Sequence, residues 1–223
     1  MEYSRVSNNS DENLILGERG DIELEPGAII MQSSIARGAY MERFSAINRC
    51  LIEGPVGVGS FAYVADSKLD KYVHIGARSI IGGFEHPTDR LSMSSMFWGQ
   101  NSHLLGTTVA ANFKHHNTKP RNRQTVIESD VWVAANCVVL PGRHLSVGTV
   151  LGSGAVLTRD TEPYGVYVGN PARCVRFRFE TSVIAELLES QWWNLPAEFL
   201  LTLNMADISN CLASIRDHRN QHQ

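Results

Sequence analysis

A repeat of six residues constrains this chain more than any other feature. From Ile127 the sequence reads IESDVW, VAANCV, VLPGRH, LSVGTV, LGSGAV, LTRDTE, and each of these sextets begins with an aliphatic residue. The fifth position of the sextet is small or β-branched, with Arg143 as the exception. A period of six fits neither an amphipathic helix nor an alternating strand. It suits short flat strands joined by turns, in which one aliphatic side chain per strand points inward.

The same period occurs upstream, in one set that begins at Ile52 and another that begins at Leu69. The first set reads IEGPVG, VGSFAY and the second reads LDKYVH, IGARSI, IGGFEH, with one residue missing between the sets. A corner between strands can absorb that missing residue. Because three such strands make one triangular coil, the repeat predicts an all-β, parallel β-helix whose coils stack about 4.8 Å apart.

The repeat divides the chain into three expected parts. Residues 1–23 are expected to be an N-terminal cap that is polar enough to be partly mobile. Residues 24–179 are expected to form the β-helix domain, from which the loop 87–125 protrudes because the repeat is lost there. Residues 180–223 are expected to be a helical cap that closes the far end, followed by a polar tail.

The expected helical cap follows a change of the apolar period to 3.6 residues after Phe179. Thr181 or Ser182 can cap a first helix, and Asn194 with Pro196 can start a second one. One face of the first helix is expected to hold Ile184, Leu187, Leu188 and Gln191.

Composition excludes several classes of partner. The chain has 223 residues, a formal net charge of -3 and a pI near 6.2, so it offers no basic field for nucleic acid or for an anionic membrane. No apolar run approaches the ~20 residues that span a bilayer, and the N-terminus lacks the pattern of a secretory signal. The four cysteines lie far apart with no C-x-x-C pair, which suggests neither a zinc site nor a disulfide framework. A soluble protein of the reducing cytoplasm is therefore expected.

Particular stretches resemble a known family. The segment from Ile127 to Phe179 resembles the acetyl-CoA-binding coils of the hexapeptide-repeat acyltransferases, which are left-handed β-helices, and it includes DVW, LTRD and GNPAR. The segment GGFEHPTDRLSMSSMFW is similar to the part that carries the catalytic histidine and the acceptor loop in capsule and O-antigen O-acetyltransferases. It is more loosely similar to the xenobiotic acetyltransferases of the chloramphenicol and streptogramin kind, and VIAELLESQWWNLPAEF resembles that branch. The resemblance implies a left-handed helix, a homotrimer with active sites at subunit interfaces, and acetyl-CoA as the donor.

Acetyl transfer from a thioester to a hydroxyl needs a base, and imidazole titrates in the useful range. His86 lies where the repeat ends, and its match to the family motif implies that it is the general base. Glu85 and Asp89 are the nearby carboxylates that could hold its other ring nitrogen. A solvated carboxylate without any role is an equally good interpretation of both.

The resemblance also places the donor and the acceptor. Ala135 and Ser153 match the small corner residues that let pantetheine lie against the backbone, and they are separated by one coil. Through the motifs LTRD and GNPAR, the resemblance places Arg159 and Arg173 at the phosphate end of coenzyme A. The planar guanidinium group of arginine is suited to binding phosphate. The predicted cofactor-binding set is Trp132, Ala135, Ser153, Thr158, Arg159 and Arg173. The predicted acceptor-binding set is Tyr63, Phe97 and Trp98.

The sequence therefore predicts an acetyl-CoA-dependent O-acetyltransferase without a metal, acting on a sugar hydroxyl of a surface polysaccharide or its precursor. The alternative is an enzyme that inactivates an antibiotic such as chloramphenicol or streptogramin. Two further classes are a non-catalytic β-helix scaffold and a zinc hydratase, because some β-helix proteins hold zinc with three histidines. The histidines considered for zinc are His74, His103, His115 and His116.

Overall fold

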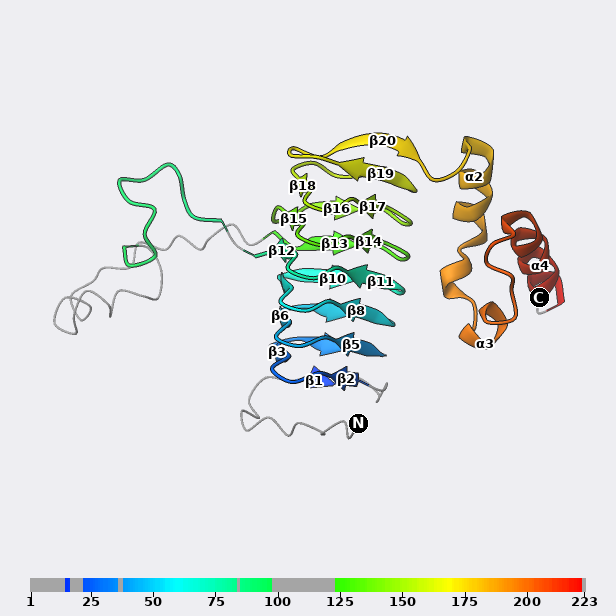
Figure 1. Ribbon diagram of the computed structural model, residues 1–223, viewed down its shortest axis with the longest axis horizontal. Helices are drawn as coiled ribbons and strands as arrows, with labels where there is room; N and C mark the ends of the chain where they lie inside the picture. Colours follow the sequence, from blue (N-terminus) through cyan, green and yellow to red (C-terminus); the bar gives the residue numbers. More distant parts are fainter. Residues whose placement is uncertain (1–14, 17–21, 36–37, 84, 98–122, 222–223) are drawn as a thin grey trace.

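The computed structural model describes residues 15–16, 22–35, 38–83, 85–97 and 123–221, and their strands stack into a three-sided prism (Figure 1). The first sheet contains β1 (Ile15–Leu16), β4 (Ser34–Ile35), β7 (Leu51–Ile52), β10 (Ser67–Leu69), β13 (Thr125–Ile127) and β16 (His144–Leu145). The second sheet contains β2 (Ile22–Leu24), β5 (Ala39–Met41), β8 (Val56–Val58), β11 (Val73–Ile75), β14 (Trp132–Val133), β17 (Val150–Leu151), β19 (Gly165–Val168) and β20 (Arg173–Phe177). The third sheet contains β3 (Ile29–Met31), β6 (Ala46–Asn48), β9 (Tyr63–Ala65), β12 (Ile80–Gly82), β15 (Val138–Val139) and β18 (Val156–Leu157).

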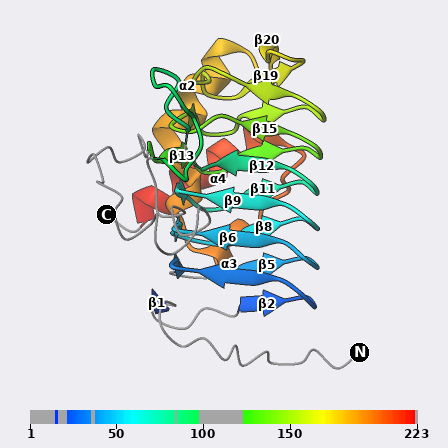
Figure 2. The ribbon, with the colours of Figure 1, turned by 90° about the vertical axis from the view of Figure 1, so that its left-hand side faces the viewer.

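The predicted fold is confirmed as a left-handed parallel β-helix, in which the chain visits the first, second and third sheets in turn. Apart from β20, the strands of each sheet pair in parallel with the strand one coil away, as Figure 2 shows. The first residue of every downstream sextet points inward and is at most 1% exposed. These inward residues are Ile127, Val133, Val139, Leu145, Leu151 and Leu157. The repeat thus builds a continuous apolar interior from one aliphatic side chain per strand.

The coils begin before the expected boundary at residue 24. Strand β1 pairs with β4 and strand β2 pairs with β5, so described parts of the 1–23 region already belong to the first coil. Ile35, Met41 and Ile47 continue the buried column through the second coil, each at most 2% exposed. Residues 1–14 and 17–21 lie outside the described residues, and the division of the chain into three parts stays a prediction.

We call the corners between sheets the first edge (first to second sheet), the second edge (second to third) and the third edge (third to first). The upstream repeat is one residue short between the inward-facing residues Val64 and Leu69, and this shorter corner lies on the third edge. The shorter corner holds Asp66, whose two carboxylate oxygens each accept a 2.6 Å hydrogen bond from the Arg49 guanidinium. This fork lies in the adjacent coil, so it connects successive turns of the helix.

The end of the chain leaves the coils through β20, which pairs antiparallel with β19 and lies beside the last coil. It is followed by α2 (Thr181–Ser190), η2 (Trp192–Asn194), α3 (Ala197–Leu200) and α4 (Ile208–Gln221). The expected caps were wrong by one position, because Glu180 is the N-cap of α2 and makes no side-chain cap hydrogen bond. Pro196 directly precedes α3, whereas Asn194 belongs to η2.

These helices lie along the first edge, whereas the sequence analysis placed them over the last coil. Figure 1 shows them beside the coils, on the opposite side from the segment that follows β12. The Trp192 ring stacks on Tyr72, with 5.7 Å between the ring centroids, and Lys71 Nζ donates to Asn194 Oδ1 at 3.1 Å. Both partners come from the middle of the coil stack, so the helices cover a side of the prism. A second apolar cluster fills this junction and contains Val147, Tyr164, Leu187 and Leu212.

Candidate active site

The chain leaves the coils where the sequence reads IIGGFEHP, immediately after β12. Gly82 and Gly83 have φ angles of +68° and +94°, which side chains other than glycine rarely adopt. A Cβ on Gly82 would lie 2.1 Å from the carbonyl oxygen of Ala65, so only glycine fits there. Thr125 re-enters the coil as the first residue of β13 and is fully buried, although the sequence analysis counted it in the loop.

His86 lies four residues beyond β12 and is exposed. Its Nδ1 atom is 2.7 Å from the carbonyl oxygen of Met93. A carbonyl oxygen can only accept, so Nδ1 carries the proton and Nε2 of the neutral ring carries the lone pair. This tautomer is the one that a general base acting through Nε2 requires.

The segment that supplies the Met93 carbonyl is held by local hydrogen bonds. Ser94 N donates to Ser92 Oγ, Met96 N donates to Ser94 Oγ, and Phe97 N donates to the Ser94 carbonyl oxygen, at 3.0 to 3.3 Å. Serine side chains commonly stabilise turns in this way. The turn therefore brings the Met93 carbonyl back toward the histidine, seven residues earlier in the chain.

The two carboxylates considered as partners of His86 are placed differently. Both Glu85 and Asp89 are exposed, and Nε of Arg90 lies 4.0 Å from Oδ1 of Asp89. Nδ1 of His86 instead contacts a backbone carbonyl. Sequence reasoning missed Met93 because every residue carries a carbonyl group, so residue type gives no signal for this contact.

Ala135 and Ser153 occupy neighbouring positions on the second edge, as their spacing predicted. Gly154 N donates to the Ala135 carbonyl at 3.0 Å, which joins the two coils at this corner. One coil earlier, a Cβ on Gly76 would lie 2.6 Å from backbone atoms of Ala134 and Ala135. At Gly76, Ala135 and Ser153 this edge thus has little or no side chain, and the backbone is accessible to a narrow ligand at Ser153, which is exposed.

Trp132 and Arg173 flank this edge on the second sheet. Trp132 is outward-facing in β14, is 51% exposed, and pairs in register with His74 of β11. Arg173 begins β20, is exposed, and donates from its guanidinium to the carbonyl of Ala172 at 2.9 Å. Both side chains are accessible to a ligand that lies along the second sheet.

Thr158 and Arg159 lie at the third edge, directly after β18. The Thr158 carbonyl accepts a 3.4 Å hydrogen bond from Arg143, and Arg159 is exposed. Arg143 is the residue that broke the sextet pattern, and its side chain is 23% exposed where its equivalents are small and buried. It pairs with Asp160 at 3.7 Å, so this position forms an ion pair where its equivalents are buried in the interior.

The predicted acceptor residues are dispersed. Tyr63 faces outward from β9 on the third sheet, is 38% exposed, and accepts a 3.4 Å hydrogen bond from Asn48. Phe97 is 54% exposed at the end of the described part of the loop. Trp98 lies outside the described residues.

One chain does not bring all of these groups to one corner. His86 follows the third edge, whereas Ala135 and Ser153 lie on the second edge. Two edges of a prism are separated by the width of a sheet. A site that uses both sets therefore needs a second copy of the chain. A site within one chain would have to consist of other residues.

Buried thiols add no nucleophile to the coils. All four cysteines are free, and Cys50 and Cys137 lie in the coil interior. Burial raises the pKa of the Cys50 thiol to about 11 and also raises the pKa of Cys137. Both thiols therefore stay protonated near neutral pH and are poor nucleophiles.

Two further searches of the described residues concern metals and membranes. No group of three or more His, Cys, Asp or Glu side chains in the described ranges is placed to hold a metal ion. His103, His115 and His116 lie outside these ranges. No helix in the described part of the chain is long and apolar enough to cross a membrane.

No protein-family model matches the chain, but individual relatives do. A chloramphenicol acetyltransferase of Escherichia coli is 42% identical over 124 residues, which are 55% of this chain and 56% of the relative. A chloramphenicol acetyltransferase of Klebsiella aerogenes is 36% identical over 124 residues with the same coverage. One of Agrobacterium fabrum is 46% identical over 76 residues, 34% of this chain and 36% of the relative. The aligned part thus spans between about a third and little more than half of the length of these relatives.

The predicted resemblance to hexapeptide-repeat acetyltransferases is confirmed. Solved structures of AntD, an N-acyltransferase from Bacillus cereus, share the fold of this chain. A mutant in complex with dTDP and coenzyme A has a TM-score of 0.58 at 14% identity, covering 79% of this chain and 89% of AntD. Another mutant, in complex with dTDP-4-amino-4,6-dideoxyglucose and coenzyme A, has a TM-score of 0.57 at 15% identity, covering 82% and 91%. At this identity the likeness is one of fold.

Proposed function

We propose that the protein transfers an acetyl group from acetyl-CoA to a hydroxyl group, with His86 as the general base. The observation that carries the proposal is the 2.7 Å contact between His86 Nδ1 and the Met93 carbonyl oxygen. It holds the imidazole in the tautomer that can accept a proton at Nε2. The histidine is also exposed at the start of a segment that leaves the coils, where an acceptor can reach it.

In the proposed reaction Nε2 takes the proton of the acceptor hydroxyl while its oxygen attacks the thioester carbonyl carbon. The tetrahedral intermediate then collapses, the carbon–sulfur bond breaks, and the imidazolium returns the proton to the sulfur of coenzyme A. The intermediate carries a negative oxygen, which backbone N–H groups at a corner would stabilise. Throughout the reaction Nδ1 keeps its proton, which it donates to the carbonyl oxygen of Met93.

The second edge is the proposed binding surface for the donor. Small residues at Ala135 and Ser153 leave room for the pantetheine arm against the backbone. Arg173 is exposed beside this edge and is available to the phosphates, whereas Arg159 is exposed on the third edge. No metal is required for this chemistry, since the base and the backbone donors supply the proton transfer and the charge stabilisation.

The proposed assembly is a homotrimer in which each active site is shared between subunits. The argument is that His86 and the Ala135–Ser153 pair lie at different edges of one chain. The test mixes two inactive variants, His86→Ala and Ser153→Trp, and assays the exchanged assembly. Returned activity supports a shared site. A mixture that stays inactive after verified exchange, or an active monomer in light scattering, contradicts it.

The acceptor is proposed to be a small antibiotic alcohol such as chloramphenicol. The relatives that are 36% and 42% identical carry that activity in their names. A sugar hydroxyl is the second candidate, because GGFEHPTDRLSMSSMFW resembles the acceptor segment of the O-antigen enzymes. A thiol-release assay with acetyl-CoA distinguishes them when chloramphenicol, a streptogramin and a panel of free and nucleotide-linked sugars are compared as acceptors.

The role of His86 is tested by His86→Ala, which should lower kcat by about 10²–10⁴ and leave folding unchanged. His218→Ala is the matched control, since His218 lies on α4 and stacks on Phe199, away from the loop. The control should retain wild-type kcat. If His86→Ala keeps more than about a third of the wild-type rate, His86 is not the base.

A further inference from the structure

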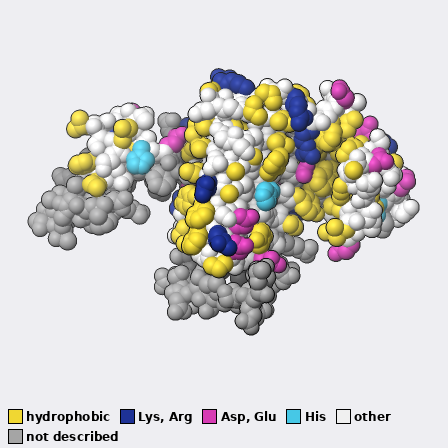
Figure 3. Space-filling view, in the orientation of Figure 1, with side chains coloured by type: hydrophobic (Ala, Val, Ile, Leu, Met, Phe, Trp, Pro, Cys, Tyr) yellow, Lys and Arg dark blue, Asp and Glu magenta, His cyan; other side chains and the backbone are white. Residues whose placement is uncertain are grey.

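The junction between the coils and the C-terminal helices contains a cavity that the acetyl-transfer proposal does not use. Its volume is about 260 Å³, and it lies at the first edge, away from Ala135, Ser153 and the loop exit. Hydrophobic side chains gather between the coils and the helices in Figure 3. The helical segment contributes most of the wall, including Leu187, Trp192, Leu203 and Leu212.

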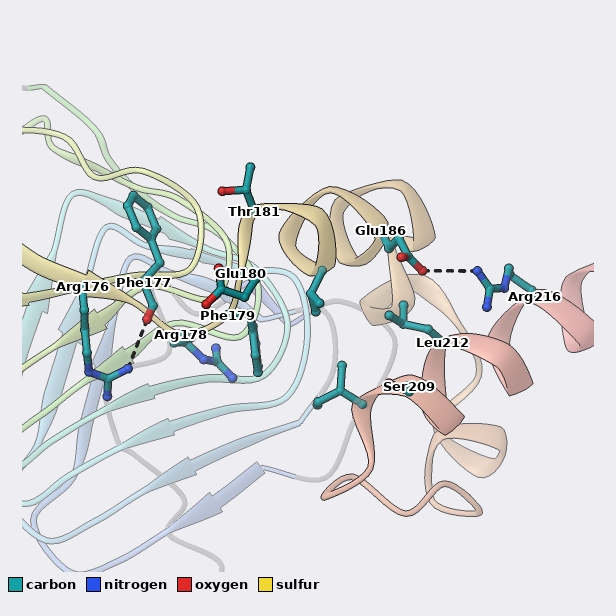
Figure 4. Close-up of a pocket in the computed structure, with 12 residues that line it drawn as sticks. Arg176, Phe177, Arg178, Phe179, Glu180, Thr181, Glu186, Ser209, Leu212 and Arg216 are labelled. Atoms are coloured by element: carbon teal, nitrogen blue, oxygen red, sulfur yellow. Dashed lines mark hydrogen bonds and ion pairs between the residues drawn. The ribbon is translucent and has the colours of Figure 1, made fainter.

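An open groove lies beside this cavity. The groove has a volume of about 840 Å³ and lies between the end of β20 and helices α2 and α4 (Figure 4). It shares Arg178, Phe179, Ile208 and Leu212 with the cavity, so the two spaces lie on either side of these residues. Movement of these side chains would connect the cavity to the groove without the coils opening.

One polar atom in the cavity wall is unusual. Tyr164 is 1% exposed, and its hydroxyl has no hydrogen-bond partner among the described residues. The indole of Trp192 lies close to this hydroxyl, but an indole N–H can only donate, so it cannot accept the phenol proton. Burial raises the pKa of Tyr164, so the hydroxyl keeps that proton. A buried donor without an acceptor is uncommon in proteins and destabilising.

The charged groups beside the cavity are already paired. Arg178 donates to Asp130 Oδ2 at 2.8 Å and to the Gly148 carbonyl at 2.9 Å. Its guanidinium also lies over the rings of Tyr164 and Phe179, 5.4 and 5.2 Å from their centroids. The wall thus has no uncompensated charge in the described residues, and an ionic ligand would find no partner there.

Packing alone does not account for this arrangement. A phenylalanine at position 164 would fill the same space without a buried donor, and the cavity is larger than one that accommodates a benzene ring, about 150 Å³. We propose that the cavity binds a small uncharged molecule, mainly apolar, with one carbonyl or ether oxygen that accepts the Tyr164 hydroxyl proton. The molecule contacts both the coils and the helices, so its binding stabilises their junction.

The experiment compares two probes of the same shape, acetophenone and cumene, of which only acetophenone carries an oxygen acceptor. Binding is measured on the full-length protein by ligand-observed NMR and by the shift of the thermal transition. Acetophenone is expected to bind in the low millimolar range or tighter, and more tightly than cumene. In Tyr164→Phe its affinity should fall about threefold to tenfold to the level of cumene, whose own affinity should not change.

A second pair of variants tests the location. Leu203→Phe places a larger side chain in the cavity wall, whereas Leu201→Phe is a matched control on a neighbouring residue that is 86% exposed. Leu203→Phe should weaken binding of both probes, and Leu201→Phe should leave it unchanged. The proposal is overturned if neither probe binds, if acetophenone binds no better than cumene, if Tyr164→Phe has no effect, or if the two leucine variants behave alike.

Discussion

The interior of the coils and the junction with the helices are both apolar, yet they are packed by different rules. Inside the coils each strand contributes one aliphatic side chain, and a neighbour one coil away has the same shape and orientation. At the junction, aromatic and aliphatic groups of unequal size meet, such as Tyr164, Trp192 and Leu212. The coil repeat closes its interior, whereas the junction retains a cavity of about 260 Å³. The same close packing is thus repeated in every coil, whereas the contact between the coils and the helices occurs once and is packed less completely.

This difference should have its largest effect on the free energy of unfolding that is lost when a buried side chain is truncated to alanine. Leu145→Ala should lower the free energy of unfolding by about 3 kcal/mol or more, because Leu145 is fully buried between coils that cannot collapse. Leu212→Ala should cost about 2 kcal/mol, because Leu212 already borders a cavity. Chemical denaturation of both variants gives the comparison. Equal costs would mean that the junction is packed as tightly as the coils.

The next effect concerns Arg178, which connects the junction to the coils through Asp130. Arg178→Ala should lower the free energy of unfolding by about 1–2 kcal/mol, because it removes a hydrogen-bonded ion pair and contacts with two rings. The pair is partly exposed, so salt should weaken it. A double-mutant cycle with Asp130→Ala isolates the ion-pair part, and a coupling energy of zero would contradict that contribution.

Thiol labelling compares the mobility of the two regions. Cys137 is fully buried in the coils and Cys211 is 9% exposed at the junction. Burial raises the pKa of both thiols, so labelling requires exposure of each to solvent. We expect Cys211 to react at least about tenfold faster than Cys137, because undocking the helices does not require the coils to open. Mass spectrometry of timed labelling with the exposed Cys174 as reference measures both rates, and a faster Cys137 would reverse the comparison.

The smallest effect is expected for Tyr164→Phe in the absence of any probe. Removing a hydroxyl that has no protein acceptor should leave the free energy of unfolding unchanged or raise it by up to about 1 kcal/mol. The raised pKa of Tyr164 also predicts how the stability of the protein depends on pH. The wild-type protein should lose stability as the pH rises above the unfolded tyrosine value of about 10, and Tyr164→Phe should lose less. A marked loss of stability in the variant at neutral pH would show that the hydroxyl is satisfied.

Much of the coil domain could be predicted from the sequence. The sextets from Ile127 to Leu157 predicted which side chain of each strand is buried, and the shorter upstream period predicted a tighter corner. The sextets were recognised only from Ile52, although Ile35, Met41 and Ile47 carry the same spacing within the predicted β-helix range 24–179. Period alone was sufficient because in a β-helix each contact is made with the equivalent residue one coil away. A local pattern therefore specifies a tertiary contact.

The tertiary structure decided what the pattern does not encode. The partner of His86 is a backbone carbonyl, which no residue type announces, and neither Glu85 nor Asp89 is that partner. The apolar face of α2 was correctly expected. The surface against which it packs was not, because an apolar face indicates only that it is covered and does not identify the element that covers it. The sequence by itself determined the coils and the accessible side chains of the second edge. Only the structure decided that the helices lie against the first edge and enclose a cavity there, because such contacts join elements that share no period.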